Sequence, residues 1–240
     1  MNKRIKNILI SIIITILALN SNVNIIAMAT GFATEELDFE KQQTLLSNID
    51  ILLLDSDSDI RAKFIVCFDV NENGLIALGF ADSTNKSVCV YSSDFTFKYG
   101  YSFICDGSFG IEWDMNNLII YFVRGDVAAS FDERGICTEM KSIRNTSENV
   151  SYWNNNVFSK KRQVGDDQYI IKNNMGIFSY FGSSYSQLIK IDENGAEIIL
   201  YDVSDAKIVR TIIAFLAVII LLVIAILTII KTARKLTRET

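Results

Sequence analysis

The stretch FDVNENGLIALGFADSTNKSVCVYSSDFTFKYGYSF, residues 68–103, contains four short runs of β-forming residues that are separated by Asp, Asn, Ser and Gly. Short runs of this kind, with turn residues between them, are typical of antiparallel strands joined by tight connections. The stretch therefore predicts one four-stranded antiparallel sheet.

The same order of strands and turns recurs twice further along the chain. Residues 109–143 read FGIEWDMNNLIIYFVRGDVAASFDERGICTEMKSI, and residues 168–203 read QYIIKNNMGIFSYFGSSYSQLIKIDENGAEIILYDV. The second strands of the three units are LIALGF, LIIYFV and GIFSYF. We therefore expect a mainly β domain made of similar antiparallel units.

The spacing of the units indicates their architecture. The third strands end at Tyr91, Phe131 and Ile191, and residues 51–64, ILLLDSDSDIRAKF, match the latter half of a unit with Leu54 in the aligned position. These positions are 37, 40 and 60 residues apart. A period near 40 with four strands per unit is the signature of a β-propeller blade.

An aspartate lies in the turn after each of these third strands. The three turns read SSDFT, DERG and DENG. An Asp side chain in a turn accepts a hydrogen bond from the backbone two residues on, and Gly135 and Gly195 supply the positive φ that closes a tight hairpin.

The units resemble the NHL-type blade of six-bladed propellers. The resemblance rests on a Gly-bearing turn, an apolar strand, the middle segment DSTNKSVCVY and an Asp turn before the final strand. It implies a non-catalytic binding scaffold. Three and a half units are fewer than the four to eight blades that close a ring. The expected fold is therefore a small or incomplete propeller, a propeller closed with a second chain, or a layered β meander.

About twenty extra residues, NTSENVSYWNNNVFSKKRQV at 145–164, account for the gap of 60. Long inserted loops on a rigid scaffold often carry function, so we predict a binding loop here. The competing interpretation is a polar excursion without a partner. The candidate binding residues are Tyr152, Trp153, Phe158, Lys160, Lys161 and Arg162.

Both ends of the chain carry membrane signals. Three cations, then an apolar run at 8–19 and AMA at 27–29, are typical of a secretory signal peptide cleaved after Ala29, with an uncleaved anchor as the alternative. Residues 211–230 are twenty uncharged residues, long enough for a transmembrane helix. The cations at 231–240 place the carboxyl end in the cytoplasm and the intervening domain outside the cell membrane.

The predicted organisation follows from these signals. It comprises a signal peptide at 1–29, an amino-terminal segment at 30–50 with a short helix within TEELDFEKQQTLL (34–46), an exported β domain at 51–207, a transmembrane helix at 208–230 and a basic tail at 231–240. We expect the short helix to cover an exposed sheet edge.

Composition excludes several classes of function. Residues 30–207 contain 15 Lys and Arg against 27 Asp and Glu, a balance that disfavours nucleic acid as a partner. The chain has no histidine, which removes the Ser-His-Asp and Cys-His catalytic arrangements. The absence of proline and the abundance of Ile, Asn and Lys indicate an AT-rich genome, typical of a Gram-positive bacterium. No cofactor is expected.

The four cysteines do not form a CxxC pair, so zinc and thioredoxin-type sites have no support. They allow either two disulfides in an oxidising compartment or buried thiols. The four residues are Cys67, Cys89, Cys105 and Cys137.

Three short motifs suggest sites, and each has a simpler explanation. The adhesion tripeptide Arg124-Gly125-Asp126 falls where a hairpin connection is expected. The sequence DSDSD at 55–59 lacks the Gly and Glu that complete a calcium loop, so a solvated turn is preferred. Glu112 and Asp114 share one side of a strand, as a glycosidase pair would, but a solvated strand end explains them too.

The sequence therefore predicts a single-pass surface protein whose propeller-like domain binds a protein or a cell-wall component without catalysis. Two alternatives remain open. One is a carboxylate-dependent enzyme acting on extracellular glycans or peptides, and the other is an accessory subunit of an envelope or export complex.

Overall fold

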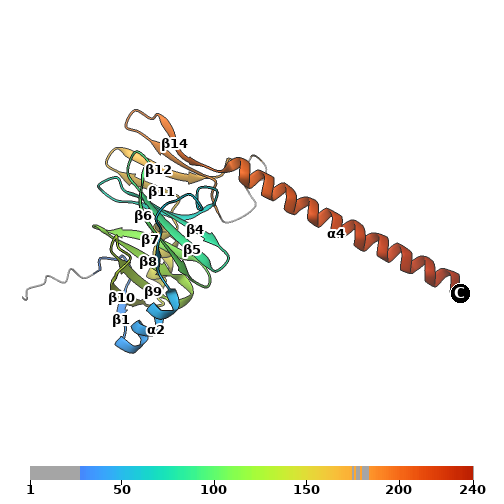
Figure 1. The fold of residues 1–240 in the computed structure, drawn as a ribbon, viewed down its shortest axis with the longest axis horizontal. Helices are drawn as coiled ribbons and strands as arrows, with labels where there is room; N and C mark the ends of the chain where they lie inside the picture. Colours follow the sequence, from blue (N-terminus) through green and yellow to red (C-terminus); the bar gives the residue numbers. More distant parts are fainter. Residues whose placement is uncertain (1–27, 175, 177–178, 180–183, 240) are drawn as a thin grey trace, which may run out of the picture.

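The computed structural model describes residues 28–174, 176, 179 and 184–239, and consists of three antiparallel sheets followed by one long helix (Figure 1). Sheet I has the strand order β2 (Leu52–Leu53), β6 (Phe97–Ile104), β5 (Asn85–Tyr91), β4 (Ile76–Asp82), β3 (Ile65–Val70). Sheet II has the order β1 (Thr34–Glu36), β10 (Cys137–Ile143), β9 (Val127–Phe131), β8 (Asn117–Phe122), β7 (Phe109–Asp114). Sheet III has the order β11 (Lys161–Val164), β12 (Asp167–Lys172), β13 (Gln187–Ile191), β14 (Glu197–Asp202). The remaining elements are α2 (Phe39–Ile49), η1 (Val123–Gly125), α3 (Ser147–Tyr152), η2 (Trp153–Val157) and α4 (Ser204–Glu239).

The predicted fold class is confirmed. The fold is mainly β, and β5, β9 and β13 end at the predicted third-strand residues Tyr91, Phe131 and Ile191. The turns behave as their sequences predict. Asp132 accepts hydrogen bonds from the backbone N–H groups two and four residues on, at 3.0 and 2.9 Å, and Gly135 has a φ of 73°.

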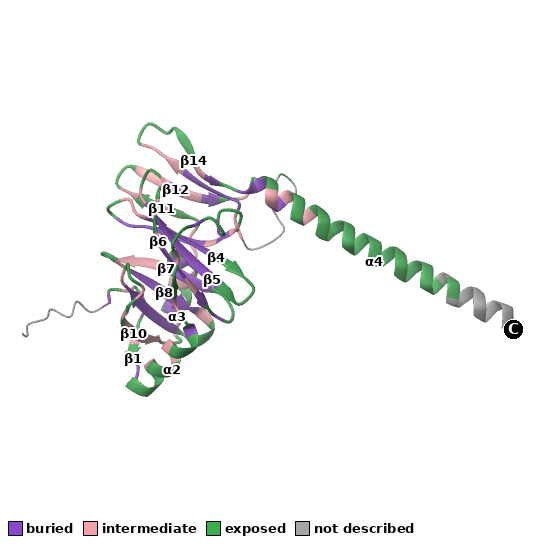
Figure 2. Cartoon of the chain, in the orientation of Figure 1, coloured by how far each residue is buried: buried purple, intermediate pink, exposed green. Residues whose placement is uncertain are grey.

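Sheet I is the middle layer of the stack. Successive side chains of a strand point to opposite faces, and β4 shows the result. Ala77 belongs to the core shared with sheet II, whereas Ile76 and Leu78 belong to the core shared with sheet III. Because both of its faces are covered, the central strands of sheet I are almost wholly buried (Figure 2).

The described strands do not close into a ring. Sheets II and III lie on opposite faces of sheet I, while the first strands β3, β7 and β11 come together at one edge of the stack. The arrangement is therefore an open stack, and the NHL-type resemblance stays an expectation.

The register predicted for the third unit was wrong. The run QYIIK was expected as its first strand but forms β12, the second, and β12 pairs directly with β13. The first strand is β11, which lies inside the predicted loop at 145–164. The stretch GIFSYF at 176–181, expected as the second strand, lies largely outside the described residues, and its described members Gly176 and Ser179 are not in a strand.

The half unit at 51–64 is not a separate blade. Its strand β2 pairs with β6 and lengthens sheet I at the outer edge. The predicted amino-terminal helix is present as α2, but it begins after Asp38, whose side chain caps it by accepting from the Lys41 N–H at 2.8 Å. Residues 34–36 instead form β1, which pairs with β10. β1 and β2 are therefore the edge strands of sheets II and I, and α2 packs through Leu45, Leu46 and Ile49 on the core between these sheets.

The Arg124-Gly125-Asp126 tripeptide lies in the connection between β8 and β9, as the hairpin interpretation predicts. Its turn differs in detail from the expected one. Asp126, not Gly125, adopts the left-handed conformation, with a φ of 49°. Aspartate is one of the few residues that tolerate this region, because its short polar side chain bonds locally.

The four cysteines are free thiols. Cys67, Cys89 and Cys105 are buried, and Cys137 is half-buried. Burial raises the pKa of Cys89 to about 12 and that of Cys137 to about 11. Because burial keeps these thiols protonated, they are poor nucleophiles. They pack in the core as small apolar side chains.

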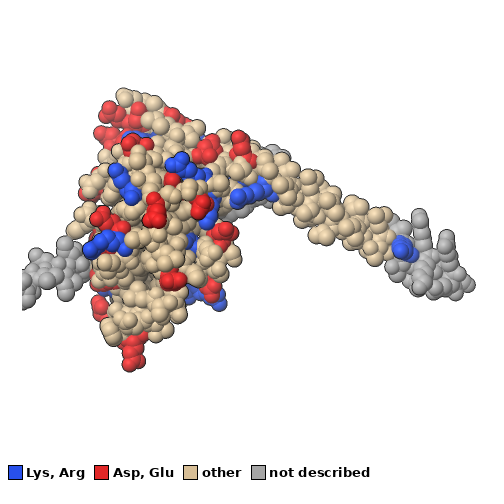
Figure 3. Space-filling model, viewed as in Figure 1, with Lys and Arg blue, Asp and Glu red and all other residues tan. Residues whose placement is uncertain are grey.

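The long helix α4 follows sheet III with only Val203 between them, so the domain has no stalk. Over Ser204–Ile229 the helix is long and apolar enough to cross a membrane, and it is largely exposed apart from Ser204 and Lys207 near its start (Figure 2). Its surface is almost free of charge, in contrast to the mixed charges of the domain (Figure 3). At the other end, the predicted signal peptide lies largely outside the described residues, and its last members Met28 and Ala29 contact sheet II through Glu139 and Asp114.

The packing of sheet I against sheet II predicts the effect of one added methyl group. A Cβ at Gly79 would stand 2.4 Å from the Cys67 sulfur and 2.9 Å from the Phe109 ring. We expect Gly79→Ala to destabilise the fold by about 1–3 kcal/mol, the usual cost of overpacking. Thermal unfolding of the full chain in detergent, followed by near-ultraviolet circular dichroism, measures this. Gly125→Ala is the matched control, since its new Cβ meets only Val127 at 3.8 Å. Equal melting temperatures for the two variants would contradict the prediction.

Candidate functional site

A cleft of about 490 Å³ opens where the three sheets meet. Each sheet and the helical insert contribute to its wall, so it exists only in the assembled stack. Its lining residues are Val66, Cys67, Ala81, Lys86, Gly107, Ser108, Phe109, Asn154, Phe158, Ser159, Ile171 and Tyr185. A larger hollow of about 620 Å³ lies elsewhere between turns of sheets I and III, but acidic turn residues dominate its wall.

The wall of the cleft combines aromatic rings with neutral polar groups. Phe109, Phe158 and Tyr185 provide the rings, while Asn154 and Ser159 provide an amide and a hydroxyl. Such a mixture suits a ligand that has apolar faces and several hydrogen-bonding groups.

Lys86 supplies the only cation among the residues that line the cleft. It lies on β5 and is 7% exposed. Its ammonium group donates to the carbonyl of Ser83, and no carboxylate pairs with it in the described part of the chain. A buried ammonium without a counter-charge is costly, so an anionic group entering the cleft would be stabilised there.

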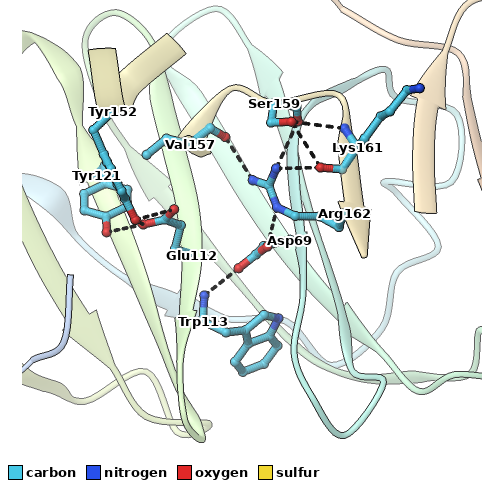
Figure 4. A network of polar contacts seen from close by, with 9 residues as sticks. All are labelled: Asp69, Glu112, Trp113, Tyr121, Tyr152, Val157, Ser159, Lys161 and Arg162. Atoms are coloured by element: carbon cyan, nitrogen blue, oxygen red, sulfur yellow. Dashed lines mark hydrogen bonds and ion pairs between the residues drawn. The ribbon is translucent and has the colours of Figure 1, made fainter. Parts of the chain in front are cut away.

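Asp69 and Arg162 form a buried ion pair (Figure 4). Asp69 lies on the same face of β3 as the cleft residue Cys67. Asp69 accepts from the Arg162 Nε at 2.5 Å and from the Trp113 backbone N–H at 2.7 Å. The pair therefore ties the first strands of all three sheets together, since Asp69 lies on β3, Trp113 on β7 and Arg162 on β11.

The remaining donors of Arg162 bind backbone carbonyl groups of the insert. Its guanidinium donates to the carbonyls of Val157 at 3.3 Å, Ser159 at 3.3 Å and Lys161 at 3.1 Å. It also lies 5.3 Å from the centre of the Phe68 ring. Burial raises the pKa of the Asp69 carboxyl, and the charge of Arg162 opposes that rise.

Glu112 is the centre of a second polar group, at the inner side of the insert (Figure 4). Its carboxylate accepts from the Tyr121 hydroxyl at 2.6 Å and from the Tyr152 hydroxyl at 3.0 Å. The Tyr121 hydroxyl also shares a hydrogen bond of 2.7 Å with Thr30. Burial is the main cause that raises the pKa of Glu112, and the negative charge of Asp69 adds to it.

The carboxylates considered for catalysis are occupied by partners within the chain. Glu112 is held by two tyrosines, and Asp114 accepts from the Ala29 N–H at 2.9 Å. In the acidic stretch at 55–59, Asp57 forms an ion pair with Arg61 at 3.0 Å. Among the described residues no group of three or more carboxylate and thiol side chains is placed to hold a metal ion.

The aromatic residues of the predicted binding loop face into the protein. The Tyr152 hydroxyl binds Glu112, and Trp153 packs on the Phe32 ring with centroids 4.6 Å apart. Phe158 stacks on Trp153 at 5.6 Å and lines the cleft. The loop is thus an ordered insert, made of α3 and η2, that closes one side of the cleft.

The basic residues of that loop separate from one another. Lys160 and Lys161 are exposed, and the Lys160 ammonium lies 5.4 Å over the Tyr185 ring. Lys161 and Arg162 belong to strand β11 rather than to a loop, and Arg162 faces inward. Alternation along the strand explains why neighbouring cations have opposite surroundings.

Sequence reasoning missed Asp69, Lys86 and Tyr185. A signal exists for Asp69, because it is a charged residue inside an otherwise apolar strand, VCFDV, whereas Lys86 lies between Asn85 and Ser87 at the polar start of β5. Charged side chains are rarely buried unless they are paired or functional. Tyr185 follows a polar stretch and has no comparable signal.

No family model matches the chain, and a search of curated proteins finds no significant match.

The buried ion pair predicts a large cost for removing Arg162. Arg162→Met leaves Asp69 buried without its counter-charge, which typically costs about 3–5 kcal/mol. Arg134→Met is the control, since its pair with Asp132 lies at the surface, where water screens the two charges and the pair contributes little to stability. Urea unfolding of the full chain in detergent, followed by the fluorescence of Trp113 and Trp153, reports the difference. Equal midpoints for both variants would show that the ion pair is not structural.

Glu112 predicts a change in the pH dependence of stability. Because the pKa of Glu112 is raised in the folded state, the folded protein holds this proton more tightly than the unfolded chain. The resulting stabilisation is fully present below the ordinary pKa of a glutamate and is lost as pH rises through the raised pKa. Glu112→Gln cannot release this proton, so we expect its stability to fall less than that of the wild type between pH 4.5 and pH 7. Urea midpoints at both values measure this, with Glu133→Gln as the exposed control. An unchanged pH dependence in Glu112→Gln would disprove the assignment.

Proposed function

We propose that this chain is a single-pass membrane protein whose β domain lies outside the cell and binds an anionic cell-wall glycopeptide without chemical change. The buried, unpaired Lys86 in a cleft formed by all three sheets carries the proposal. The membrane part rests on α4, whose apolar length is sufficient to span a bilayer. The cations Lys231, Arg234, Lys235 and Arg238 that follow it favour a cytoplasmic carboxyl end.

The chemistry of the cleft matches such a ligand in three respects. Aromatic rings pack against the C–H faces of sugars, and Asn and Ser side chains bond their hydroxyl and amide groups. The Lys86 ammonium suits a carboxylate of the peptide part. A cell-wall fragment carries all three kinds of group, and a Gram-positive surface would present it directly to the domain.

The arrangement of the carboxylates favours binding over catalysis. A general acid or base must reach the reacting group, and Asp69 and Glu112 each already bind groups of the exported domain. Asp69 is neutralised by Arg162, and Glu112 is enclosed by two tyrosines. We therefore assign these acids to the assembly of the fold.

The test is a titration of the full chain in lipid nanodiscs with a soluble disaccharide-peptide fragment of peptidoglycan. Trp153 is the reporter, because it stacks on the cleft residue Phe158. We expect saturable binding that Lys86→Met weakens about 10- to 100-fold, since a hydrogen bond to a charged group contributes about 1.5–3 kcal/mol. Lys98→Met is the control, because Lys98 is an exposed cation on β6 of the same sheet.

Two further measurements test the need for a carboxylate and the absence of catalysis. A neutral chitin oligosaccharide, which lacks the carboxylates, should bind more weakly than the fragment. Mass spectrometry of the fragment after incubation should show it intact. Absence of binding, or binding that ignores Lys86→Met, would reject the ligand site, and a cleaved fragment would reject the non-catalytic assignment.

A further inference from the structure

Three consecutive residues, Ser184, Tyr185 and Ser186, lie between the cleft and the start of the membrane helix. Tyr185 forms an isolated antiparallel bridge with Ile65, so the backbone is extended there. In an extended segment neighbouring side chains point to opposite sides. The Tyr185 ring therefore faces the cleft while the Ser186 hydroxyl faces the start of α4.

The Tyr185 side of this segment belongs to the cleft. Its ring is part of the cleft wall, and the Lys160 ammonium lies over it. Its backbone is tied to sheet I, because the Ile65 N–H donates to the Tyr185 carbonyl at 2.9 Å and the Tyr185 N–H donates to the Ile65 carbonyl at 2.7 Å. A ligand in the cleft therefore contacts a residue that joins sheet I to the segment before β13.

The serine side of the segment holds the first turn of α4. The Ser186 and Ser204 hydroxyls share a hydrogen bond of 2.9 Å, and both residues are buried. The Ser186 carbonyl accepts from the Val203 N–H at 2.8 Å, and the Ser184 carbonyl accepts from the Lys207 ammonium. These three contacts fix the helix start to the same short stretch of backbone.

Lys207 makes this attachment rigid. It is 4% exposed although it lies in a helix whose later residues are exposed. Besides Ser184, its ammonium donates to the Asn173 side-chain oxygen at 3.0 Å and lies 5.2 Å over the ring of Phe64, the residue before Ile65. A buried ammonium that lost these partners would be left unsatisfied, which is costly. The helix therefore cannot shift against the segment without a large loss.

We propose that the cleft and the membrane helix are energetically coupled through residues 184–186. The ligand half of the proposal rests on the function proposed above, whereas the coupling itself is a property of the protein alone. A ligand that displaces Tyr185 changes the position of the Ser184 carbonyl and the Ser186 hydroxyl, and so the hold on Lys207 and Ser204. Coupling of this kind is reciprocal, so a change at the helix start must also alter the cleft.

The reciprocal direction is testable without any ligand. Hydrogen exchange of the full chain in nanodiscs would compare the wild type with Lys207→Met, which keeps the stem and removes the charge. Lys231→Met, the same change at the far end of the helix, is the control. We expect the amides of Ile65 and Tyr185 to exchange at least about tenfold faster in Lys207→Met and unchanged in Lys231→Met. Amides of β8 in sheet II should keep their wild-type rates.

Two outcomes bear directly on the coupling. Faster exchange confined to the helix start, with Ile65 and Tyr185 at wild-type rates, would overturn it. If Lys207→Met loosens β8 as well, the variant is globally unfolded, and Ser204→Ala replaces it as the milder change with the same two readings.

The forward direction uses the peptidoglycan fragment as the probe. If the fragment binds, exchange at residues 204–208 should change by at least about threefold in the wild type, and by less in Tyr185→Ala, which removes the ring from the cleft wall. Binding without any change at 204–208 would overturn the coupling while leaving the proposed function intact. If the fragment does not bind, the proposed function fails, and the comparison of Lys207→Met with Lys231→Met still decides the coupling.

Discussion

The structure depends on the burial of sheet I on both faces. An antiparallel sheet usually has one face in water, and its strands then alternate apolar and polar residues. Here sheets II and III cover opposite faces, so the central strands of sheet I carry apolar residues on both sides. This is why β4 contains the apolar run IALGFA and β5 the apolar run VCVY. It is also why even one methyl group at Gly79 has no room.

Because sheet I is buried on both faces, the polar residues inside the stack must find partners within the protein. Asp69 and Arg162 are far apart in the sequence, yet they form a close ion pair because β3 and β11 meet at the convergent edge of the sheets. The pair also binds the Trp113 backbone on β7. One ion pair therefore connects three strands from three sheets, where apolar side chains would pack but would not fix the relative positions of the strands so specifically.

The cleft and the apolar helix α4 are close to each other along the chain, because the segment before β13 lines the cleft and β14 leads into α4. The stack leaves a cleft where its three layers meet, and the segment before β13 forms part of that wall. The following strand pair leads directly into α4 without a linker. A cleft and an apolar helix that share a few residues of backbone have little freedom to move independently, unlike two parts joined by a long flexible linker.

The local elements follow from the order of the amino acids alone. Turn chemistry located the ends of three strands, because Asp and Gly close tight hairpins whatever surrounds them, and the apolar length of residues 211–230 was sufficient to predict the long helix. The order of the amino acids did not determine how the units are shared among sheets. The edge strands β1 and β2 are three and two residues long, too short to leave a pattern, and β11 is a polar strand hidden within a loop-like stretch. The candidate site belongs entirely to the tertiary structure. Lys86, Phe109 and Tyr185 line one cleft only when the sheets stack, since burial and the shape of a cleft are properties of distant residues brought into contact.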